Sequence, residues 1–305
     1  MRKDGSPEGD TPASDHQGAG SGAEKAAFFV VFTDLDGTLL DHNTYEWRDA
    51  GPALNLCRRL GAPVVLVSSK TRAEMDRLRI RMGLHSPFVS ENGGGIFFPV
   101  SGCAWPPGDA MREGDLWKWS LGIPYEGLLG VLRDLRKETG LPIRGFSDMG
   151  IEEISRLTGL DPDTARLAAQ REFDEPLILE DPRGAGLDLL RNAAAARGLT
   201  LSEGGRFHHL HGGGDKGEAV DRLIAWYREE YPHLLSVAMG DSPNDFPMLE
   251  RADIPVLVRS DRDPKGLEQR IPGLRITREK GPRGWNRAVL DILHGKRMEG
   301  VSRDV

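Results

Sequence analysis

Acidic residues follow two widely separated apolar runs of this 305-residue chain. The run FFVVFT ends at residue 33 and leads directly into Asp34 and Asp36. The run LSVAM ends at residue 239 and leads into the string GDSPND, which contains Asp241 and Asp245. If folding brings these loops together, several carboxylates crowd one site, which is costly unless a cation lies among them. Hard oxygen ligands beside a phosphate suit magnesium, so we expect Mg²⁺ as the cofactor.

With a cation drawing off the negative charge, one carboxylate can approach a phosphoryl group. We expect Asp34 to act as the nucleophile and to form a covalent aspartyl-phosphate. Asp36 can turn back at Gly37 to protonate the leaving alcohol and later to deprotonate water. Ser68 follows the apolar run 64–67, and Lys216 opens a helical pattern in the string GDKG. Both would stabilise charge on the phosphoryl oxygens, so these four residues are the predicted catalytic set.

Each of these strings also has a simpler structural interpretation. DLDG is often an acidic surface turn, SSK commonly caps a helix, and GDSPND can be an Asx turn. These three strings and GDKG each lie at the end of a predicted strand or the start of a predicted helix, in the order that a single site requires. Their conjunction favours catalysis over four unrelated turns.

The elements that must position these residues alternate along the chain. Short continuous apolar runs at 28–33, 64–67, 235–239 and 255–258 are typical of strands buried on both faces of a parallel sheet. Helical patterns are expected at 48–60, 71–82 and 216–230. The alternation predicts an α/β fold with a doubly wound, Rossmann-like parallel sheet, whose ligands bind at the carboxyl ends of the strands.

The middle of the chain has a different composition and predicts a second compact unit. Strands are expected at 143–147 and 176–180, and helices at 125–137, 163–172 and 186–196. We therefore predict a core formed by 26–100 and 205–297, with an α+β domain inserted at 101–204. Residues 1–25, rich in Gly, Ser, Asp and Pro, and residues 298–305 are predicted tails.

Composition narrows the range of partners. The formal net charge is -7 with no long basic stretch, which argues against nucleic-acid and membrane-surface partners. The two cysteines, Cys57 and Cys103, have no metal-type spacing and are expected to be reduced thiols. No apolar stretch is long enough to cross a bilayer, and no secretory signal begins the chain, so we expect a cytoplasmic protein. The oligomeric state is left open.

The catalytic strings resemble those of the haloacid dehalogenase-like phosphohydrolases, over residues 28–293, and the insertion resembles the larger α/β cap of that superfamily. Longer strings are similar to the mannosyl-3-phosphoglycerate phosphatase family within it: FTDLDGTLLDHNTYEW, SSKTRAEM, ENGGGIFFP, REFDEPLILED, GGGDKGEAV, GDSPNDFPML and GPRGWNRAV. The resemblance implies that Asp34, the backbone carbonyl of Asp36 and Asp241 bind the metal, with Asp245 as a supporting ligand.

The resemblance also implies a substrate, a phosphorylated sugar-glycerate that is hydrolysed to mannosylglycerate and phosphate in compatible-solute synthesis. Hydrolysis of glucosyl-3-phosphoglycerate is the first alternative, because the two sugars differ in one hydroxyl orientation. Another sugar-phosphate phosphatase of the superfamily is a broader alternative. A catalytically silent binding module of the same fold would be expected to lack catalytic residues, and Asp34, Asp36, Lys216 and Asp241 are all present.

Such a substrate carries a carboxylate and a hydroxyl-rich ring in addition to its phosphate. A carboxylate needs a cation, and a ring needs short polar side chains and backbone that can approach closely. The predicted substrate-binding residues are Ser69, Lys70, Arg72, Glu91, Asn92, Gly93, Arg171 and Arg206. Two simpler interpretations stay open: each arginine pairs with a nearby carboxylate, and the string ENGGG is a hairpin turn. A strand containing His208, with His209 and His211 on its other face, is expected to approach the site.

Overall fold

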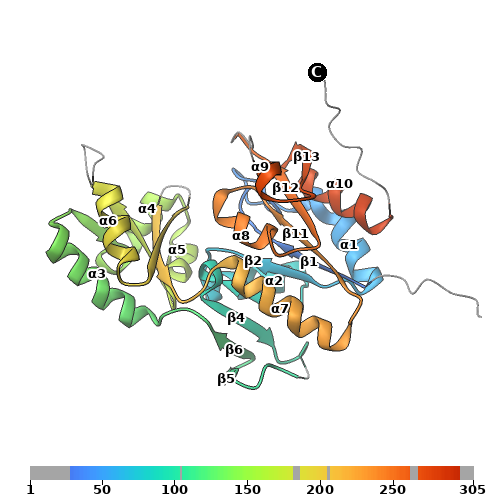
Figure 1. Ribbon diagram of the computed structural model, residues 1–305, viewed down its shortest axis with the longest axis horizontal. Coiled ribbons are helices and arrows are strands. Elements are labelled where there is room, and N and C mark those ends of the chain that lie inside the picture. The colour runs from blue at the N-terminus through green and yellow to red at the C-terminus, as the bar shows by residue number, and fades with distance from the viewer. Residues whose placement is uncertain (1–27, 104, 181–185, 205–206, 262–266, 296–305) are drawn as a thin grey trace, which may run out of the picture.

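The structure is a computed structural model that describes residues 28–103, 105–180, 186–204, 207–261 and 267–295. The predicted tails at 1–25 and 298–305 lie outside the described residues. The chain forms two sheets with helices packed against them (Figure 1). The large sheet consists of β1 (Phe29–Thr33), β2 (Val64–Val67), β3 (Phe88–Ser90), β4 (Gly95–Pro99), β5 (Met111–Glu113), β6 (Leu116–Ser120), β11 (Leu235–Gly240), β12 (Ile254–Arg259) and β13 (Arg275–Lys280).

The strand order of the large sheet is β13-β12-β11-β1-β2-β3-β4-β6-β5. Neighbouring strands from β13 to β3 run parallel, and β4, β6 and β5 extend the sheet with antiparallel pairing. Strand β1 lies between β2 and β11, so the direction in which the strands are added reverses at β1. This order confirms the predicted doubly wound α/β sheet, with its switch point at β1.

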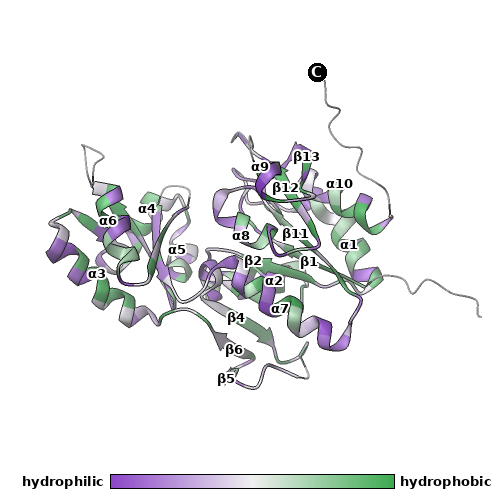
Figure 2. Ribbon diagram, in the orientation of Figure 1, coloured by the Kyte–Doolittle hydropathy of each residue, from purple (hydrophilic) through white to green (hydrophobic). Residues whose placement is uncertain are grey.

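Helices cover both faces of the parallel strands. Val31 of β1 belongs to the hydrophobic cluster that includes residues of α1 (Gly51–Leu60), α2 (Arg72–Met82) and α10 (Gly281–Leu293). Val30 and Phe32 belong to the cluster on the opposite face, with α7 (Lys216–Glu230), α8 (Phe246–Leu249) and α9 (Leu267–Arg270). Because both faces are buried, the strands contain continuous apolar runs, which Figure 2 shows along β1 and β11.

The small sheet is antiparallel, with strand order β7-β8-β10-β9. Its strands are β7 (Ile143–Gly145), β8 (Asp174–Leu179), β9 (Leu199–Gly204) and β10 (Phe207–Gly212). A hydrophobic cluster joins one face to α3 (Tyr125–Thr139) and α6 (Gly186–Ala195). A smaller cluster contains Phe146 and Phe207 with residues of α4 (Ile151–Thr158) and α5 (Pro162–Ala168). The small sheet and its helices lie at the left of Figure 1.

The inserted unit differs from the sequence-based boundaries at both ends. Strands β5 and β6, within the predicted insertion at 101–204, pair into the large sheet. Strand β10, predicted to belong to the core, pairs with β8 and β9 in the small sheet. By sheet membership the small layer therefore runs from α3 to β10. The division of the chain into a core and a separate cap domain stays a prediction.

One predicted helix is shorter than expected. The pattern at 163–172 predicts a helix to residue 172, but α5 ends at Ala168. The backbone amides of Glu172 and Phe173 donate to the carboxylate of Glu91 instead of to helix carbonyls. Beyond the end of the helix, a buried acceptor from the other layer holds the segment that leads into β8.

Three short 3-10 helices complete the connections: η1 (Arg48–Ala50) before α1, η2 (Glu91–Gly93) between β3 and β4, and η4 (Pro243–Asp245) after β11. A fourth, η3 (Phe146–Asp148), follows β7. Within the described residues, none of the helices has both the length and the apolar character that a membrane span requires.

Candidate active site

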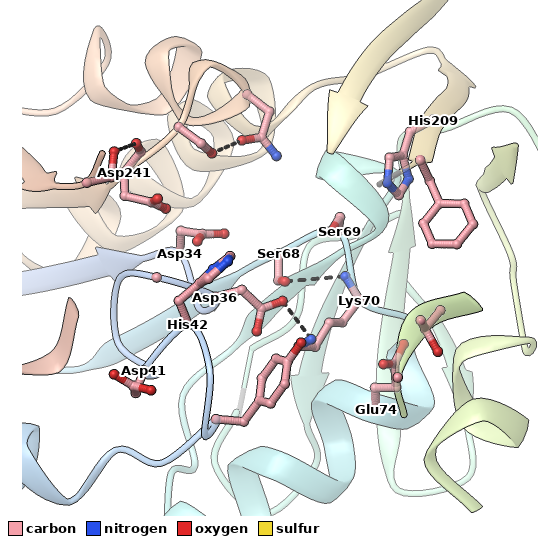
Figure 3. A pocket seen from close by; sticks show the side chains of 18 of the residues that line it. Asp34, Asp36, Asp41, His42, Ser68, Ser69, Lys70, Glu74, His209 and Asp241 are labelled. Carbon is pink, nitrogen blue, oxygen red and sulfur yellow. Dashed lines mark hydrogen bonds and ion pairs between the residues drawn. The ribbon is translucent and has the colours of Figure 1, made fainter. Parts of the chain in front are cut away.

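The polar loops after β1, β2 and β11 meet at the carboxyl end of the large sheet. The amide of Asp34 extends the parallel ladder by donating to the carbonyl oxygen of Met239 at 2.8 Å. Asp34, Ser68 and Asp241 line one pocket, which Figure 3 shows from close by. The structure thus brings together side chains that lie far apart in the sequence, as the strand pattern predicts.

A tight turn directs Asp36 into the same pocket. Gly37 has a φ of 84°, and the amide of Leu40 donates to the carbonyl oxygen of Leu35 at 2.8 Å. A Cβ atom at Gly37 would lie 2.9 Å from Oδ2 of Asp241, so glycine is needed both for the turn and for this close approach. Asp36 lines the pocket, and among the described residues its buried Oδ1 has no hydrogen-bond partner.

Lys216 lies beneath the pocket, at the first residue of α7. Its side chain is 1% exposed, and Nζ is 2.7 Å from Oδ1 of Asp34 and 2.7 Å from Oδ1 of Asp245. Burial alone would lower the pKa of Lys216, but the carboxylates of Asp245 and Asp34 outweigh burial and raise it. The ammonium group is therefore charged at neutral pH and fixed against Asp34.

Asp245 holds the loop after β11 in place. Its Oδ2 accepts hydrogen bonds from the amides of Asp241 and Ser242, both at 3.0 Å, and from Oγ of Ser242 at 2.9 Å. Its Oδ1 accepts from Lys216. Because both of its carboxylate oxygens accept hydrogen bonds, Asp245 orients the loop after β11 and the side chain of Lys216. The carboxylate of Asp241 accepts from Oγ1 of Thr38 at 3.2 Å, which ties it to the turn after β1.

The protein alone leaves an excess of negative charge in this cluster. Burial raises the pKa of Asp34 well above its ordinary value, the charge of Asp245 adds to that rise, and Lys216 opposes it only in part. Oxygen atoms of Asp34, Asp241 and Asp245 lie within 4.8 Å of one another. Three carboxylates with one buried lysine, all offering hard oxygen atoms, fit a divalent cation such as magnesium. The residues present are therefore suited to a metal ion.

The pocket above this cluster has a volume of about 1010 Å³ and extends from the large sheet to the small one. Asp34, Asp36 and Asp241 line one side of it, and residues of β10 and of the segment after β7 line the other. In Figure 3, His209 lies on the opposite side of the view from Asp34 and Asp241. A site of this size accommodates a small organic phosphate between the two layers.

Comparison with known proteins identifies the family. Residues 31–101 match the model of the haloacid dehalogenase-like hydrolase family. A Methanococcoides burtonii protein named glucosyl-3-phosphoglycerate/mannosyl-3-phosphoglycerate phosphatase is 41% identical over 269 residues, covering 87% of this chain and 97% of that protein. A Pyrococcus furiosus protein named mannosyl-3-phosphoglycerate phosphatase is 34% identical over 230 residues, covering 75% of this chain and 90% of its own length. This chain belongs to the haloacid dehalogenase-like hydrolases.

Solved structures agree in fold. A Thermoplasma acidophilum protein superposes with a TM-score of 0.64 at 21% identity, covering 88% of this chain and 99% of its own. A haloacid dehalogenase-like hydrolase from Bacteroides thetaiotaomicron gives a TM-score of 0.60 at 16% identity, covering 87% and 99%. The sequence relatives thus confirm the resemblance and the hydrolase class, and the solved structures confirm the fold.

Lys70, predicted to bind the carboxylate of the substrate, instead contacts the carboxylate of Asp36. Its Nζ donates to Oδ2 of Asp36 at 2.7 Å and lies 5.5 Å from the ring centroid of Tyr45. Burial would lower the pKa of Lys70, but Asp36 and Glu74 raise it, so the ammonium stays charged. Lys70 lines the pocket, yet its position beside Asp36 is that of a residue that holds the proposed acid/base.

The predicted ring-binding string ENGGG lies under the small layer instead of in the pocket lining. Glu91 is 1% exposed and accepts from the amides of Glu172 and Phe173. Burial raises its pKa to about 7. Nδ2 of Asn92 donates to Oδ2 of Asp174, the first residue of β8. A Cβ atom at Gly93 would lie 2.1 Å from the carbonyl oxygen of Asp215, the residue before α7. The string is a tight connection between β3 and β4 that also binds the segment leading into β8.

The remaining predicted substrate residues divide into two groups. Ser69 and Arg171 line the pocket and contact each other, since Nη1 of Arg171 donates to the carbonyl oxygen of Ser69 at 2.9 Å. Arg72 is outside the pocket lining and forms an ion pair with Glu172 at 2.7 Å. Arg206 lies outside the described residues. Arg72 therefore follows the simpler interpretation, in which a surface arginine pairs with a nearby carboxylate.

Several pocket residues were not identified as site residues from the sequence. Tyr45, Phe146, Phe207 and His209 all line it. The histidine string around His209 was expected to form a strand near the site, and β10 is that strand. Alternation along a strand defines two faces, but nothing in the sequence says which face is turned toward the pocket.

Proposed function

We propose that this chain hydrolyses the phosphate monoester of a glycosyl-3-phosphoglycerate, with Asp34 as the nucleophile. The observation that carries the proposal is the Asp34 carboxylate, held by buried Lys216 at 2.7 Å on the wall of a pocket at the end of β1. Relatives at 41% and 34% identity are named as phosphatases of such compounds.

In the proposed reaction an oxygen of Asp34 attacks the phosphorus atom and the sugar-glycerate alcohol leaves. Asp36 gives a proton to that alcohol oxygen and then takes one from the water that attacks the aspartyl-phosphate. Its placement two residues after Asp34, on the turn at Gly37, supports this role. Lys70 holds the Asp36 carboxylate in the pocket while the substrate enters and the product leaves.

Two residues of the chain stabilise the charge of the reaction. Lys216 keeps the Asp34 carboxylate oriented and offsets the charge that develops as the phosphoryl group is transferred. Ser68 is 1% exposed and lines the pocket at the end of β2, where its hydroxyl can donate to a phosphoryl oxygen. Fixed donors of this kind need no reorganisation during the reaction.

Magnesium is the proposed cofactor, with Asp34, Asp241 and the backbone carbonyl of Asp36 as its protein ligands. The metal would neutralise the carboxylates and the phosphate so that the two anions can meet. Asp245 supports the site by orienting the loop of Asp241 and the ammonium of Lys216. We propose that the large sheet forms the catalytic core and the small sheet its cap. Cytoplasmic location stays a prediction.

Both sugars are proposed as substrates, because two relatives, including one from Persephonella marina that is 38% identical over 267 residues, are named for both the glucosyl and the mannosyl compound. The test is phosphate release by the full chain with magnesium from mannosyl- and glucosyl-3-phosphoglycerate, with mannose-6-phosphate and sucrose-6-phosphate as controls. We expect efficient hydrolysis of one or both glycosyl-3-phosphoglycerates and poor hydrolysis of the controls. Faster hydrolysis of either control would contradict the proposed substrate class.

A further inference from the structure

The small sheet presents one face of β10 to the pocket. Phe207 and His209 alternate along β10 and both line the pocket, together with Pro176, which pairs with His209 across the sheet. Leu210 and His208 are on the other face, where Leu210 belongs to the cluster with α3 and α6. One face of β10 therefore lines the pocket, and the other face packs against α3 and α6.

A fully buried carboxylate fixes the orientation of His209. Nδ1 of His209 lies 2.9 Å from Oδ1 and 3.0 Å from Oδ2 of Asp174, which is 0% exposed. Asp174 also accepts from Nδ2 of Asn92 at 2.7 Å. His209 itself is only 6% exposed. A histidine held in this way has its ring plane set by the carboxylate and not by solvent.

The same contact makes Nδ1 of His209 a hydrogen-bond donor. Burial would raise the pKa of Asp174, but His209 and Arg171 outweigh burial and lower it to about 2, so the group is a carboxylate at neutral pH. A carboxylate only accepts, hence Nδ1 of His209 is the donor. Nε2, the other ring nitrogen, has no protein partner among the described residues and belongs to a side chain that lines the pocket.

Two aromatic side chains line the same pocket as His209. The rings of Phe146 and Phe207 meet edge to face with centroids 5.1 Å apart, and both side chains line the pocket. A ring of a sugar has apolar C–H faces and hydroxyl edges, so it suits a site that combines aromatic side chains with a few fixed polar groups.

Lys70 and Arg171, the pocket-lining cations among the predicted substrate-binding residues, are less suited to contact the sugar. Lys70 is bound to Asp36, and Arg171 donates to the carbonyl oxygens of Ser69 and Ala168. His209 is a buried, pocket-lining residue of the small sheet whose contacts within the described part of the protein are made through Nδ1, which leaves Nε2 for a ligand.

We propose that His209 is the specificity residue for the sugar, with Nε2 hydrogen-bonded to a ring hydroxyl and the ring lying against Phe207. This inference rests on the proposed function and extends it to the residue that separates glycosylated from unglycosylated phosphoglycerate. Asp174 is the positioning residue, because it acts only through the orientation of His209.

The test compares two substitutions that each keep one half of the imidazole. In His209→Gln the amide reaches the place of Nε2, and in His209→Asn it reaches only the place of Nδ1. The measured quantity is kcat/KM on mannosyl- or glucosyl-3-phosphoglycerate divided by kcat/KM on 3-phosphoglycerate, which has the carboxylate and the phosphate but no sugar. We expect the ratio to fall roughly 10- to 100-fold in His209→Asn and by only a few-fold in His209→Gln. His208→Asn, on the other face of β10, is the matched control and should keep the wild-type ratio.

Three results would overturn the inference. A wild-type ratio in His209→Asn means that Nε2 does not read the sugar. Recovery by Asn but not by Gln means that His209 serves only to satisfy Asp174. An equal loss on all substrates, which leaves the ratio unchanged, assigns His209 to the shared phosphoglycerate part. If the His209 variants do not fold, Phe207→Leu must lower the same ratio or the inference fails. A wild-type enzyme that hydrolyses neither glycoside but still hydrolyses an aryl phosphate refutes the proposed function itself.

Discussion

Replacing Lys216 with methionine should destabilise the protein because Lys216 is the buried cation of an acidic cluster. The side chain is 1% exposed, and its two 2.7 Å contacts go to Asp34 and Asp245, the second of which is 0% exposed. Methionine keeps most of the volume but leaves both carboxylates without their cation. Removing one partner of a buried ion pair costs about 3–5 kcal/mol, and that cost is the expected loss here.

The measurement is urea unfolding in the presence of a chelator at neutral pH. Arg222→Met is the matched control, because Arg222 is on the same helix and pairs with Glu218 at 2.9 Å, with both side chains more than 40% exposed, at 42% and 44%. An exposed pair of this kind contributes at most about 1 kcal/mol. Added magnesium should restore part of the stability lost in Lys216→Met, since a divalent cation can replace the missing charge.

Turnover provides a second measurement on the same variant. Loss of a fixed charge beside the reacting group should lower kcat by roughly 100- to 1,000-fold. A destabilisation of Lys216→Met no larger than that of Arg222→Met would refute the account of a charge-compensated cluster.

Two further predictions concern the turn at Gly37 and the buried carboxylate of Glu91. Gly37→Ala places a Cβ atom 2.9 Å from Oδ2 of Asp241 at a φ of 84°, which strains the turn and displaces Asp241. Calorimetric titration should therefore show weaker magnesium binding, and turnover should fall. A magnesium affinity equal to that of the wild type would contradict the geometry. Burial raises the pKa of Glu91 from 4.5 to about 7, so the native state holds this proton more tightly and stability falls as pH rises between these values. Glu91→Gln should flatten the pH dependence of urea midpoints there, by up to about 3 kcal/mol, and an unchanged slope would count against it.

The clustering of Asp34, Asp241 and Asp245 could be predicted from the sequence because each of their loops follows a strand that the sequence marks clearly. Apolar runs such as the one before Asp34 have the composition of parallel strands buried on both faces, and parallel strands bring their carboxyl ends to one edge. The position of each polar residue after its strand then determines the site without any knowledge of side-chain contacts.

The partners of the proposed substrate-binding residues could not be predicted in the same way, because the sequence does not reveal which group a charged residue contacts. Lys70 is bound to Asp36, and Arg72 is bound to Glu172, one hundred positions further along the chain. The carboxylate of Glu91 is occupied by two backbone amides of the other layer. The contacts of Arg72 and Glu91 depend on how the small sheet is placed against the large one, and the contact of Lys70 depends on how the loops after β1 and β2 pack together. Local patterns specify neither.

The same limit explains the difference at the boundaries of the inserted unit. Strands β5 and β6 are short, and the residues of β5 are exposed, so their membership in the large sheet comes from the pairing of β6 with β4 and of β5 with β6. The pairing of β10 with β8 likewise joins residues far apart in the chain. Pairing across such distances is decided by tertiary packing and not by the composition of the strand itself.

The central claim is that the carboxylate of Asp34 is the attacking group. Its most direct test is rapid acid quench of the enzyme during turnover with magnesium and mannosyl-3-phosphoglycerate, followed by peptide mass spectrometry. The account predicts a phosphoryl adduct on Asp34 that disappears when the substrate is exhausted, and no adduct or turnover in Asp34→Asn. An adduct on another residue, or turnover by Asp34→Asn at the wild-type rate, would contradict it.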